Sequence, residues 1–450
     1  MHLVHTNGER KALTKRDVLR IAREQEVRFV RLCFVDILGI SKNVTIPVTE
    51  LEQAIEGKVT FDGGSIDGFV RGEEVDMILR PDLATFGVYP WTSGTSVEAR
   101  LLCDIATPDG EPFEGCPRTT LQRVIEDTRS VLNGVIAGIE VEFYLFELDE
   151  HGNPRPATED VGGYFDLSAT DRGEDARIAM VTALESMGLS IASAHHEHGA
   201  GQHEIDFKPS GLLATADNLI TMRAVARHVA ARHGLHATFM PKPLETLAGS
   251  GVHIEFVLPG LSAEEEPLPS DELGEETLFA IGGLLEHAPA FTAICNPTVN
   301  SYKRLVAAWD APIYTVWSHH SANSLVRVPA PVGGRPHIEV RSADPSCNPY
   351  LAMAVLLASI AHGIRNHALP GDPLVGSTYE LSERERSGRR IRTLPKSLRQ
   401  AIDELDRDTV IRGALGDHIY HAFRDAKYAE YERYRRAVHP WEREAYLRVY

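Results

Sequence analysis

The chain has 450 residues, and its 64 acidic and 46 basic side chains give a formal net charge of −18. This excess of acid excludes nucleic acid and anionic membranes as main partners, because binding to phosphates requires an excess of Lys and Arg. The hydrophobic fraction of 43% excludes general disorder, and the length predicts two or three domains of roughly 150 residues each.

The first hundred residues predict a small β-rich unit. Residues 14–25 have the apolar pattern of a helix behind a possible N-cap at Thr14. Residues 27–35 alternate as a strand, and a turn at 36–39 leads to a second strand at 42–47. Residues 104–117 contain three Pro and two Gly, which marks a linker with a domain boundary near residue 107.

Beyond this linker, helices and strands are interspersed without a regular βαβ alternation. Helical patterns lie at residues 119–132, 175–187, 216–233, 277–288 and 350–366, and the tail after residue 398 is mostly helical. Strands are predicted at residues 135–148, 252–258, 324–328 and 337–342. This order predicts an α+β fold in which antiparallel strands carry polar side chains on one face.

Cysteine usage and the apolar stretches indicate where the protein resides. The five cysteines are isolated and form no CxxC pair, so we expect reduced thiols. The polar start of the chain lacks the apolar core of an export signal. The uncharged stretch at residues 350–364 has the length of a buried core helix and is too short for a bilayer span. We therefore predict a soluble cytoplasmic protein with no membrane partner.

Two glutamates alternate with apolar side chains in the predicted strand at residues 135–148. Glu140 and Glu142 face one way, while Ile139, Val141 and Phe143 face the other. Adjacent carboxylates repel each other unless a cation lies between them. A divalent metal site is one interpretation of this pattern, and a solvated sheet face is the other.

Three further polar clusters favour the metal site. Glu197 and Glu204 flank a Gly-rich turn within residues 195–206, which hold four His, two Glu and one Asp. His253 follows a second Gly-rich turn, and Glu339 shares a strand face with Arg341. Carboxylates with a single imidazole suit Mg²⁺ or Mn²⁺ better than a cysteine-rich zinc site.

Arginines lie beside these predicted metal strands. The guanidinium groups of Arg304, Arg327 and Arg341 suit recognition of carboxylate and phosphate, although each alone could form a surface ion pair. The chain has no P-loop motif and no protein-kinase motif set. We infer a phosphate-handling enzyme that acts on a carboxylate substrate.

From about residue 14 to residue 450, the chain resembles the glutamine synthetase family, in the shorter form of its bacterial type I. Six segments carry the resemblance: VDILG at 35–39, FDGGSIDGF at 61–69, GQHE at 201–204, HATFMPKP at 236–243, NPTVNSYKR at 296–304 and VHPWERE at 438–444.

The resemblance implies a fold, an assembly and a reaction. The fold is an N-terminal β-grasp domain at residues 14–107, followed at 108–450 by an α+β catalytic domain with an antiparallel active-site sheet and flanking helices. The assembly is a dodecamer with active sites shared between subunits. In the reaction, ATP phosphorylates the γ-carboxylate of glutamate and ammonia displaces the phosphate, with roughly two or three Mg²⁺ or Mn²⁺ ions at each site.

The resemblance also implies metal ligands. The ligands of the first ion would be Glu142, Glu197 and Glu204. The ligands of the second ion, beside the transferred phosphoryl group, would be Glu140, His253 and Glu339.

Other site residues follow from the same motifs. Glutamate-binding roles fall on Arg304, Arg341 and Gly249. Nucleotide and phosphate contacts fall on Arg327 and His337. The residues that handle ammonium would be Asp62 of the neighbouring subunit, Asp310 on a flap, and Tyr164.

Four positions depart from the family pattern. Asp310 replaces a flap glutamate, Ala322 a phosphate-contacting arginine, Ala248 an asparagine of the glutamate pocket, and His337 an arginine near the nucleotide. Asp310 keeps the charge but has one methylene fewer than glutamate. This difference is important, because a reacting group that is misplaced by about 1 Å can lower the reaction rate on the order of 10²-fold.

These departures leave three readings open. The first is a glutamate–ammonia ligase, favoured because Asp62, Tyr164 and the charge of Asp310 remain. The second is a glutamate–amine ligase that uses an organic amine. The third is a non-catalytic assembly protein, which the complete ligand set disfavours.

Overall fold

The computed structural model describes residues 12–66, 68, 75–155, 158–167, 169–258, 273–308, 311–329 and 337–450. Within them the chain forms two sheets with flanking helices, the α+β class that the sequence predicts. All five cysteines are free thiols.

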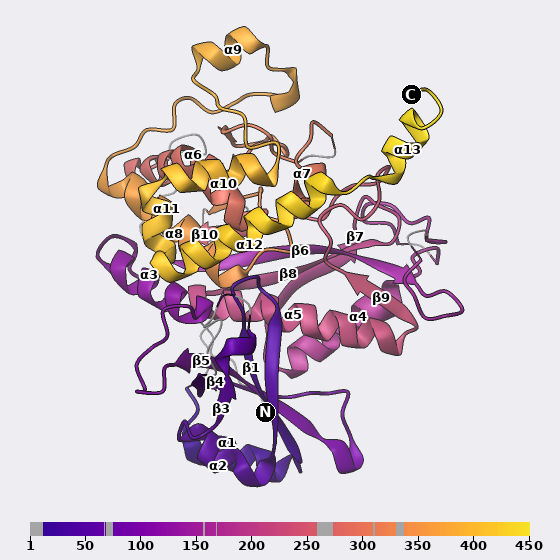
Figure 1. The fold of residues 1–450 in the computed structure, drawn as a ribbon, viewed down its shortest axis with the longest axis vertical. Helices are drawn as coiled ribbons and strands as arrows, with labels where there is room; N and C mark the ends of the chain where they lie inside the picture. Colours follow the sequence, from indigo (N-terminus) through magenta and orange to yellow (C-terminus); the bar gives the residue numbers. More distant parts are fainter. Residues whose placement is uncertain are drawn as a thin grey trace.

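The first sheet has five strands in the order β2-β1-β5-β4-β3, with β1 and β5 parallel and the other pairs antiparallel. The strands are β1 Phe29–Val35, β2 Ser41–Pro47, β3 Thr60–Asp62, β4 Asp76–Val88 and β5 Glu98–Ala106. Helices α1 Lys15–Glu24 and α2 Leu51–Ile55 accompany it. Figure 1 shows this unit in indigo and violet at one end of the molecule.

The second sheet has eight strands in the order β11-β12-β13-β10-β6-β8-β7, and β9 also pairs with β6. Apart from the parallel pair β11–β12, its pairings are antiparallel, as predicted. The strands are β6 Ile136–Glu147, β7 Ile191–His196, β8 Gln202–Gly211, β9 Leu235–Thr238, β10 Val252–Val257, β11 Trp317–Ser318, β12 Val326–Arg327 and β13 Ile338–Val340.

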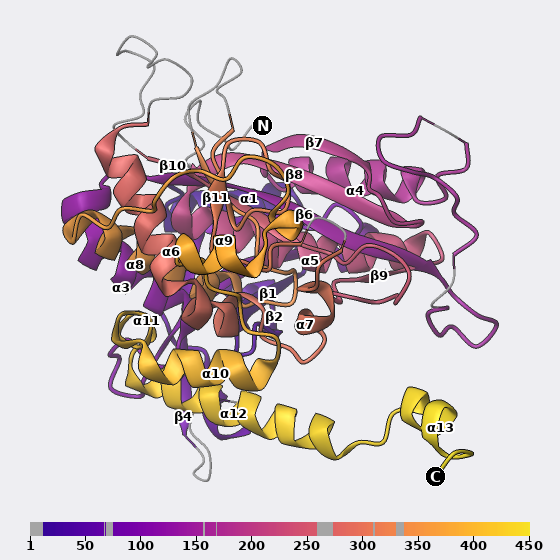
Figure 2. The same cartoon turned by 90° about the horizontal axis from the view of Figure 1, so that it is seen from above.

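Helices cover this second sheet on one face and at one end (Figures 1 and 2). The α-helices that follow the first sheet are α3 Pro117–Leu132, α4 Glu174–Ser186, α5 Leu212–Arg232, α6 Glu275–Cys295, α7 Ser301–Arg304, α8 Pro349–Arg365, α9 Glu383–Gly388, α10 Leu398–Arg407, α11 Thr409–Leu415, α12 Asp417–Arg436 and α13 Pro440–Tyr446, of which α9 and α13 lie away from the sheet. Val141 and Phe143 of β6 are fully buried in the same core cluster as Leu219 and Ile220 of α5. One face of the sheet is therefore core, and its other face is left for the polar side chains.

Two predicted elements have other bounds in the structure, and strands β3, β4, β5, β7, β8, β9 and β11 were not predicted. The predicted linker 104–117 is shorter, because β5 runs to Ala106 and α3 begins at Pro117. The predicted helix 277–288 continues to Cys295 as α6, through Pro289. Proline lacks the N–H that would bond the carbonyl of Leu285, and Arg392 donates to that carbonyl instead, at 3.3 Å.

Helix α6 is, by length and composition, the one described helix able to cross a membrane. Its apolar window is 78% buried inside the fold. Its neighbours there include α8 and α10. The apolar surface of α6 is thus covered by protein.

Helix α13 extends away from the body in both views of the chain (Figures 1 and 2). We call residues 440–450 the C-terminal arm. It exposes large apolar side chains, since Trp441 is 64% exposed and Leu447 is 76% exposed. A single copy of the chain leaves this apolar surface uncovered.

Candidate functional site

A cavity of about 680 Å³ opens on the polar face of the second sheet. Ten of the predicted site residues line it: Glu140, Glu142, Tyr164, Glu197, Glu204, Gly249, His253, Arg304, Arg327 and Arg341. They come from β6, β8, β10 and β12, from helix α7 and from the loops that adjoin the sheet. The pairing of these strands brings together segments that lie as much as two hundred residues apart in the sequence.

Strand β6 carries the two glutamates whose alternation the sequence displays. Glu140 and Glu142 line the cavity, while Ile139, Val141 and Phe143 lie in the core on the opposite face. The predicted division of faces is confirmed, and the two carboxylates are half-buried in the wall of a cavity that other acidic side chains also line.

The first ligand group joins three neighbouring strands. In the sheet register, His253 of β10 lies opposite Glu140 of β6, and β13 places Glu339 on the other side. Nδ1 of His253 is 2.7 Å from Glu140 Oε2 and 3.5 Å from Glu339 Oε1. One ligand atom from each of the three lies within 4.8 Å of the others, which suits a single metal ion.

His253 also helps to keep Glu140 ionised. Burial alone would raise the pKa of Glu140, but the hydrogen bond with His253 and the nearby arginines lower it to about 2. Glu140 is therefore anionic at neutral pH, as a ligand for a hard cation must be.

The second ligand group lies one strand further along the sheet. It consists of His195 on β7, Glu197 just after it, and Glu204 on β8. Nε2 of His195 is 3.5 Å from Glu204 Oε1, and its Nδ1 is 3.7 Å from Glu197 Oε2. Glu142 lies opposite Glu204 in the sheet register.

The composition of this group differs from the predicted one. His195 belongs to it and was not among the predicted ligands. Glu142, which was predicted as the third ligand, instead accepts from Gly251 N at 2.9 Å and from Gln202 Nε2 at 3.1 Å. Its charge still acts on the group, because it raises the pKa values of Glu197 and Glu204.

The carboxylates of the second ligand group have too little positive charge around them to stay ionised. Burial, followed by the charge of Glu142, raises the pKa of Glu197 to about 8. The same two causes, in the same order, raise the pKa of Glu204. A divalent cation would replace the bound protons and restore the anionic forms.

Two buried oxygen atoms offer a further test of the fit to a cation. Within the described part of the chain, neither Glu197 Oε2 nor Asp206 Oδ1 has a hydrogen-bond partner. Buried carboxylate oxygens without a donor are costly unless a cation takes the place of that donor. The oxygen-rich donor set with imidazoles therefore fits Mg²⁺ or Mn²⁺.

The three predicted arginines lie at the same cavity, on the side of β12 and β13. Arg327 and Arg341 both pair with Glu339, which is fully buried behind the cavity wall. Arg304 is buried and donates to the carbonyl oxygens of Ser342 at 2.8 Å and Arg341 at 3.1 Å. Positive charge thus lies next to the first ligand group in the wall of the cavity, as binding of an anionic substrate requires.

Tyr164 lies at the cavity rim beside the second ligand group. Its ring stacks on His198, with centroids 4.3 Å apart, and meets His195 edge-on at 5.7 Å. Two positions that depart from the family pattern, Ala248 and Ala322, also line the cavity. Their small side chains leave space where the family pattern has larger polar ones.

Three predicted site residues lie elsewhere. Asp62 ends β3 in the first sheet, and the described lining of this chain's cavity does not include it. His337 lies just before β13, with its Nε2 3.4 Å from Glu255 Oε1, and is likewise absent from the described lining. Asp310 falls outside the described residues.

Sequence reasoning missed two further carboxylates of the site. Asp206 lines the cavity opposite Glu140 in the register. Glu255 lies opposite Glu339, and burial, followed by the charge of Glu140, raises its pKa to about 8. Alternation offered a signal, because Asp206 is two residues from Glu204 and Glu255 is two residues from His253 on their strands.

Comparison with known proteins supplies independent findings. Residues 26–108 match the family model described as the glutamine synthetase β-grasp domain, and residues 114–446 match the glutamine synthetase catalytic domain. A protein of Thermus thermophilus named glutamine synthetase is 46% identical over 97% of this chain and 99% of its own length. One from Methanosarcina mazei is 44% identical over 97% of this chain and 98% of its own length.

Solved structures agree on the fold. A structure titled as a complex of GmaS with ADP has a TM-score of 0.86 and 28% identity, and covers 96% of this chain and 99% of its own. An apo GmaS structure has a TM-score of 0.84 and 29% identity over the same shares.

Proposed function

The chain belongs to the glutamine synthetase family and is an ATP-dependent carbon–nitrogen ligase, and from this premise we propose that it joins ammonia to the γ-carboxylate of glutamate. The observation that carries the proposal is one cavity in which Arg304, Arg327 and Arg341 face two groups of carboxylate and imidazole ligands. This arrangement suits a phosphorylated carboxylate with its divalent cations.

We assign the metals to the two groups, as a proposal. Glu140, His253 and Glu339 would hold one divalent cation. Glu197 and Glu204 would hold another, together with His195 of their group and with Glu142, which the family resemblance implies as a ligand. When bound, such cations neutralise the charge of the ATP phosphates. The buried, unpaired oxygen of Glu197 supports this assignment.

The side chains of the cavity would then bind and orient the substrates. Arg304 and Arg341 would bind the carboxylate of glutamate near Gly249, and Arg327 would stabilise the charge on the transferred phosphoryl group. The γ-carboxylate attacks the terminal phosphorus of ATP, ADP leaves, and the lone pair of ammonia then attacks the acyl carbon and displaces phosphate. His337 would approach the nucleotide from the edge of the sheet.

Ammonium must lose a proton before it attacks. The anionic wall beside Tyr164 favours NH₄⁺, and we assign the proton to Asp62 of a neighbouring copy, with Asp310 closing the pocket. Hydrogen bonds from the Gly64 backbone amide and the Ser65 hydroxyl lower the pKa of Asp62, which keeps its carboxylate anionic.

This role for Asp62 requires an oligomer, and we propose the shared-site dodecamer. Its support is the exposed apolar arm at α13, which needs a cover, and the position of Asp62 outside the cavity of its own chain. We also propose a cytoplasmic location and the domain division 14–107 and 108–450.

An organic amine is the second candidate acceptor. Ala248 and Ala322 leave space in the cavity where the family pattern has larger side chains. Extra volume next to the acyl carbon would admit an alkyl group on the attacking nitrogen.

One assay decides between these acceptors. Purified protein with ATP, Mg²⁺ or Mn²⁺ and glutamate is given ammonium or one of a panel of primary amines, and phosphate release and the amide product are measured. Release with ammonium and formation of glutamine support the proposal. Release only with an amine supports the second candidate, and no release from an intact oligomer under any condition overturns both.

A further inference from the structure

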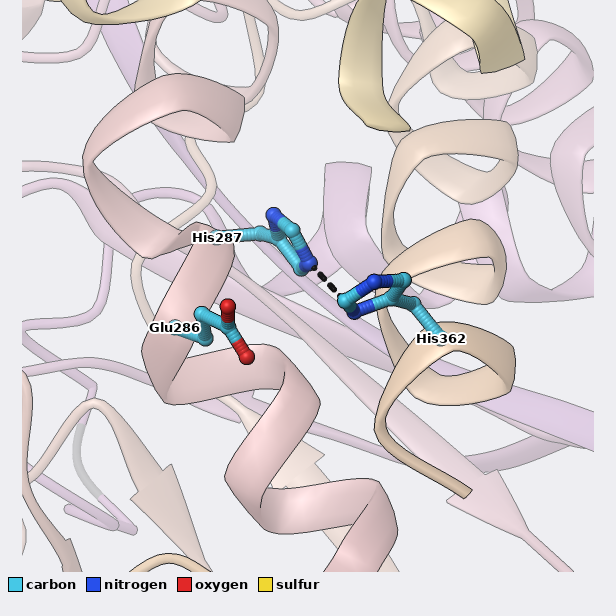
Figure 3. Close-up of side chains that lie close together, drawn as sticks. All are labelled: Glu286, His287 and His362. Carbon is cyan, nitrogen blue, oxygen red and sulfur yellow. Dashed lines mark hydrogen bonds between the residues drawn. The ribbon is translucent and has the colours of Figure 1, made fainter. Parts of the chain in front are cut away.

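A further group of metal-type ligands lies in the helical layer, away from the cavity described above. Glu286 and His287 are on α6, and His362 is on the neighbouring helix α8. Figure 3 shows the two imidazole rings pointing toward each other across the helix interface, with the Glu286 carboxylate below them. One ligand atom from each of the three lies within 4.8 Å of the others.

The two imidazoles are already close to chelating geometry. Nε2 of His287 is 3.0 Å from Nδ1 of His362, and the rings lie at 77° to each other. Two nitrogen ligands on a tetrahedral Zn²⁺ with bonds of about 2.0–2.1 Å stand about 3.3 Å apart. The rings would therefore need only a small movement to bind one ion.

A carboxylate on the far side of His287 fixes which nitrogen is free. Asp408 Oδ2 is 2.6 Å from Nδ1 of His287. A carboxylate can only accept, so this Nδ1 carries the proton and Nε2 of the neutral ring presents its lone pair to His362. Carboxylates that orient metal-binding histidines in this way are a regular part of zinc sites.

Burial and access also suit a bound ion. His287 is 5% exposed, whereas Glu286 is exposed and forms part of the wall of a separate cavity of about 660 Å³. Glu286 is thus the member of the group that lies at a solvent-accessible cavity. Imidazole nitrogen selects Zn²⁺ over Mg²⁺, unlike the carboxylate-rich cavity.

We propose that Glu286, His287 and His362 form a Zn²⁺ site that joins α6 to α8, with Asp408 as the carboxylate that orients His287. Asp408 also caps α11, because its Oδ1 accepts from Val410 N and Ile411 N at 3.0 Å. The ion would therefore connect the two core helices with the junction between α10 and α11.

The test measures zinc retained by the full-length oligomer in saturating Mg²⁺, which competes for the carboxylate-rich cavity. Chelator-treated protein is incubated with Zn²⁺, passed through gel filtration and analysed for metal. We expect the wild type to retain one more zinc per chain than the double variant His287→Gln/His362→Gln. His421→Gln, a change at an exposed histidine of α12, should retain as much as the wild type.

Two milder variants guard against loss of folding. Glu286→Gln alters a surface ligand, and we expect zinc affinity to fall about 10-fold or more. Asp408→Asn keeps the helix cap, since Asn caps as well as Asp, and we expect a fall of about 10–100-fold. Co²⁺ bound by the wild type should show the intense visible absorption of tetrahedral coordination, which the double variant lacks.

Equal zinc retention in the wild type and the double variant overturns the proposal, and the contacts are then a hydrogen-bonded Asp–His–His chain only. If the double variant fails to fold, unchanged zinc affinity in Glu286→Gln and Asp408→Asn overturns it equally.

Discussion

Glu197 contains a buried carboxyl group whose pKa is raised to about 8, first by burial and then by the charge of Glu142. In the unfolded chain the same group has its ordinary pKa of 4.5. At a pH between these two pKa values, Glu197 carries a proton in the folded state and has lost it in the unfolded state. The stability of the metal-free protein therefore decreases as the pH rises through this window.

We predict that the stability of Glu197→Gln falls less with rising pH than that of the wild type, by about 1–3 kcal/mol, since one pKa unit corresponds to about 1.4 kcal/mol. Thermal unfolding in a chelator, from about pH 5 to about pH 9, measures the effect. Glu185→Gln, at an exposed position of α4, is the matched control. A decrease of the same size in the wild type and in Glu197→Gln would contradict the prediction.

Gly251 lies where the guanidinium of Arg304 passes close to the backbone. A Cβ at this position would stand 2.5 Å from Nη2 of Arg304 and 3.4 Å from Glu142 Oε1. Any side chain here must displace Arg304, the proposed carboxylate-binding group.

We predict that Gly251→Ala raises the KM for glutamate about 10-fold or more, because a misplaced binding group loses its contacts. Steady-state kinetics with varied glutamate measure the change. Gly413→Ala on α11, where a Cβ meets open space, is the control. An unchanged KM in Gly251→Ala would show that Arg304 does not bind glutamate.

Helices α6 and α8 approach each other closely enough to touch along their backbones. A Cβ at Gly283 of α6 would stand 2.1 Å from the carbonyl oxygen of Ser359 on α8. A Cβ at Gly363 of α8 would meet the carbonyl of Phe279 at the same distance. Glycine at both positions permits the contact that also brings His287 and His362 together.

We predict that Gly283→Ala destabilises the protein by about 1–3 kcal/mol or more, since extra atoms in a packed interface force the backbones apart. Denaturant unfolding measures the loss. Gly413→Ala serves again as the control and should be neutral or stabilising, because alanine favours a helix by up to about 1 kcal/mol over glycine. Equal stabilities of the two variants would refute the close-packing argument.

Arg118 connects the first sheet to helix α5, which packs on the second sheet. From α3 it donates to Asp82 and Asp104 of the first sheet at 2.6 and 2.8 Å, and to Asp217 of α5 at 3.0 Å. Arg118 and Asp217 are both buried, and Tyr350 also donates to Asp217, at 2.7 Å.

We predict that Arg118→Met destabilises the protein by about 3–5 kcal/mol, because the buried charge of Asp217 loses its counter-ion. Arg129→Met, which breaks an exposed pair with Glu126, should change stability by less than about 0.5 kcal/mol. Thermal unfolding of both variants measures the difference. A small effect of Arg118→Met would mean that the contact of the first sheet with α5 does not depend on this arginine.

The proposed shared active site predicts complementation between subunits. Asp62→Asn and Arg341→Ala should each be inactive in pure oligomers. When the two variants are co-expressed and mix at random, roughly a quarter of the sites combine an intact cavity with an Asp62 from a neighbouring subunit. The mixed oligomers should therefore recover roughly a quarter of wild-type activity. No recovery in confirmed mixed oligomers would show that Asp62 does not act across an interface.

The sequence by itself determined the local features of this protein. Alternation along β6 assigned Glu140 and Glu142 to one face, because side-chain direction in a strand follows from backbone geometry alone. The six family segments identified the family, and the interspersed pattern identified the α+β class. Strands β3, β4, β5, β7, β8, β9 and β11 were missed. Pro81 and Gly87 interrupt the apolar pattern of β4, and β3, β9 and β11 are too short to show a period.

Only the tertiary structure decided which of these features meet. Strand pairing set Glu255 opposite Glu339 and placed His195 with Glu204, and no local period reports the neighbour of a strand. Burial decided the pKa of Glu197, and the close contact of α6 with α8 decided that His287 faces His362. These are effects of packing between segments distant in sequence, and they distinguish a list of polar residues from a site.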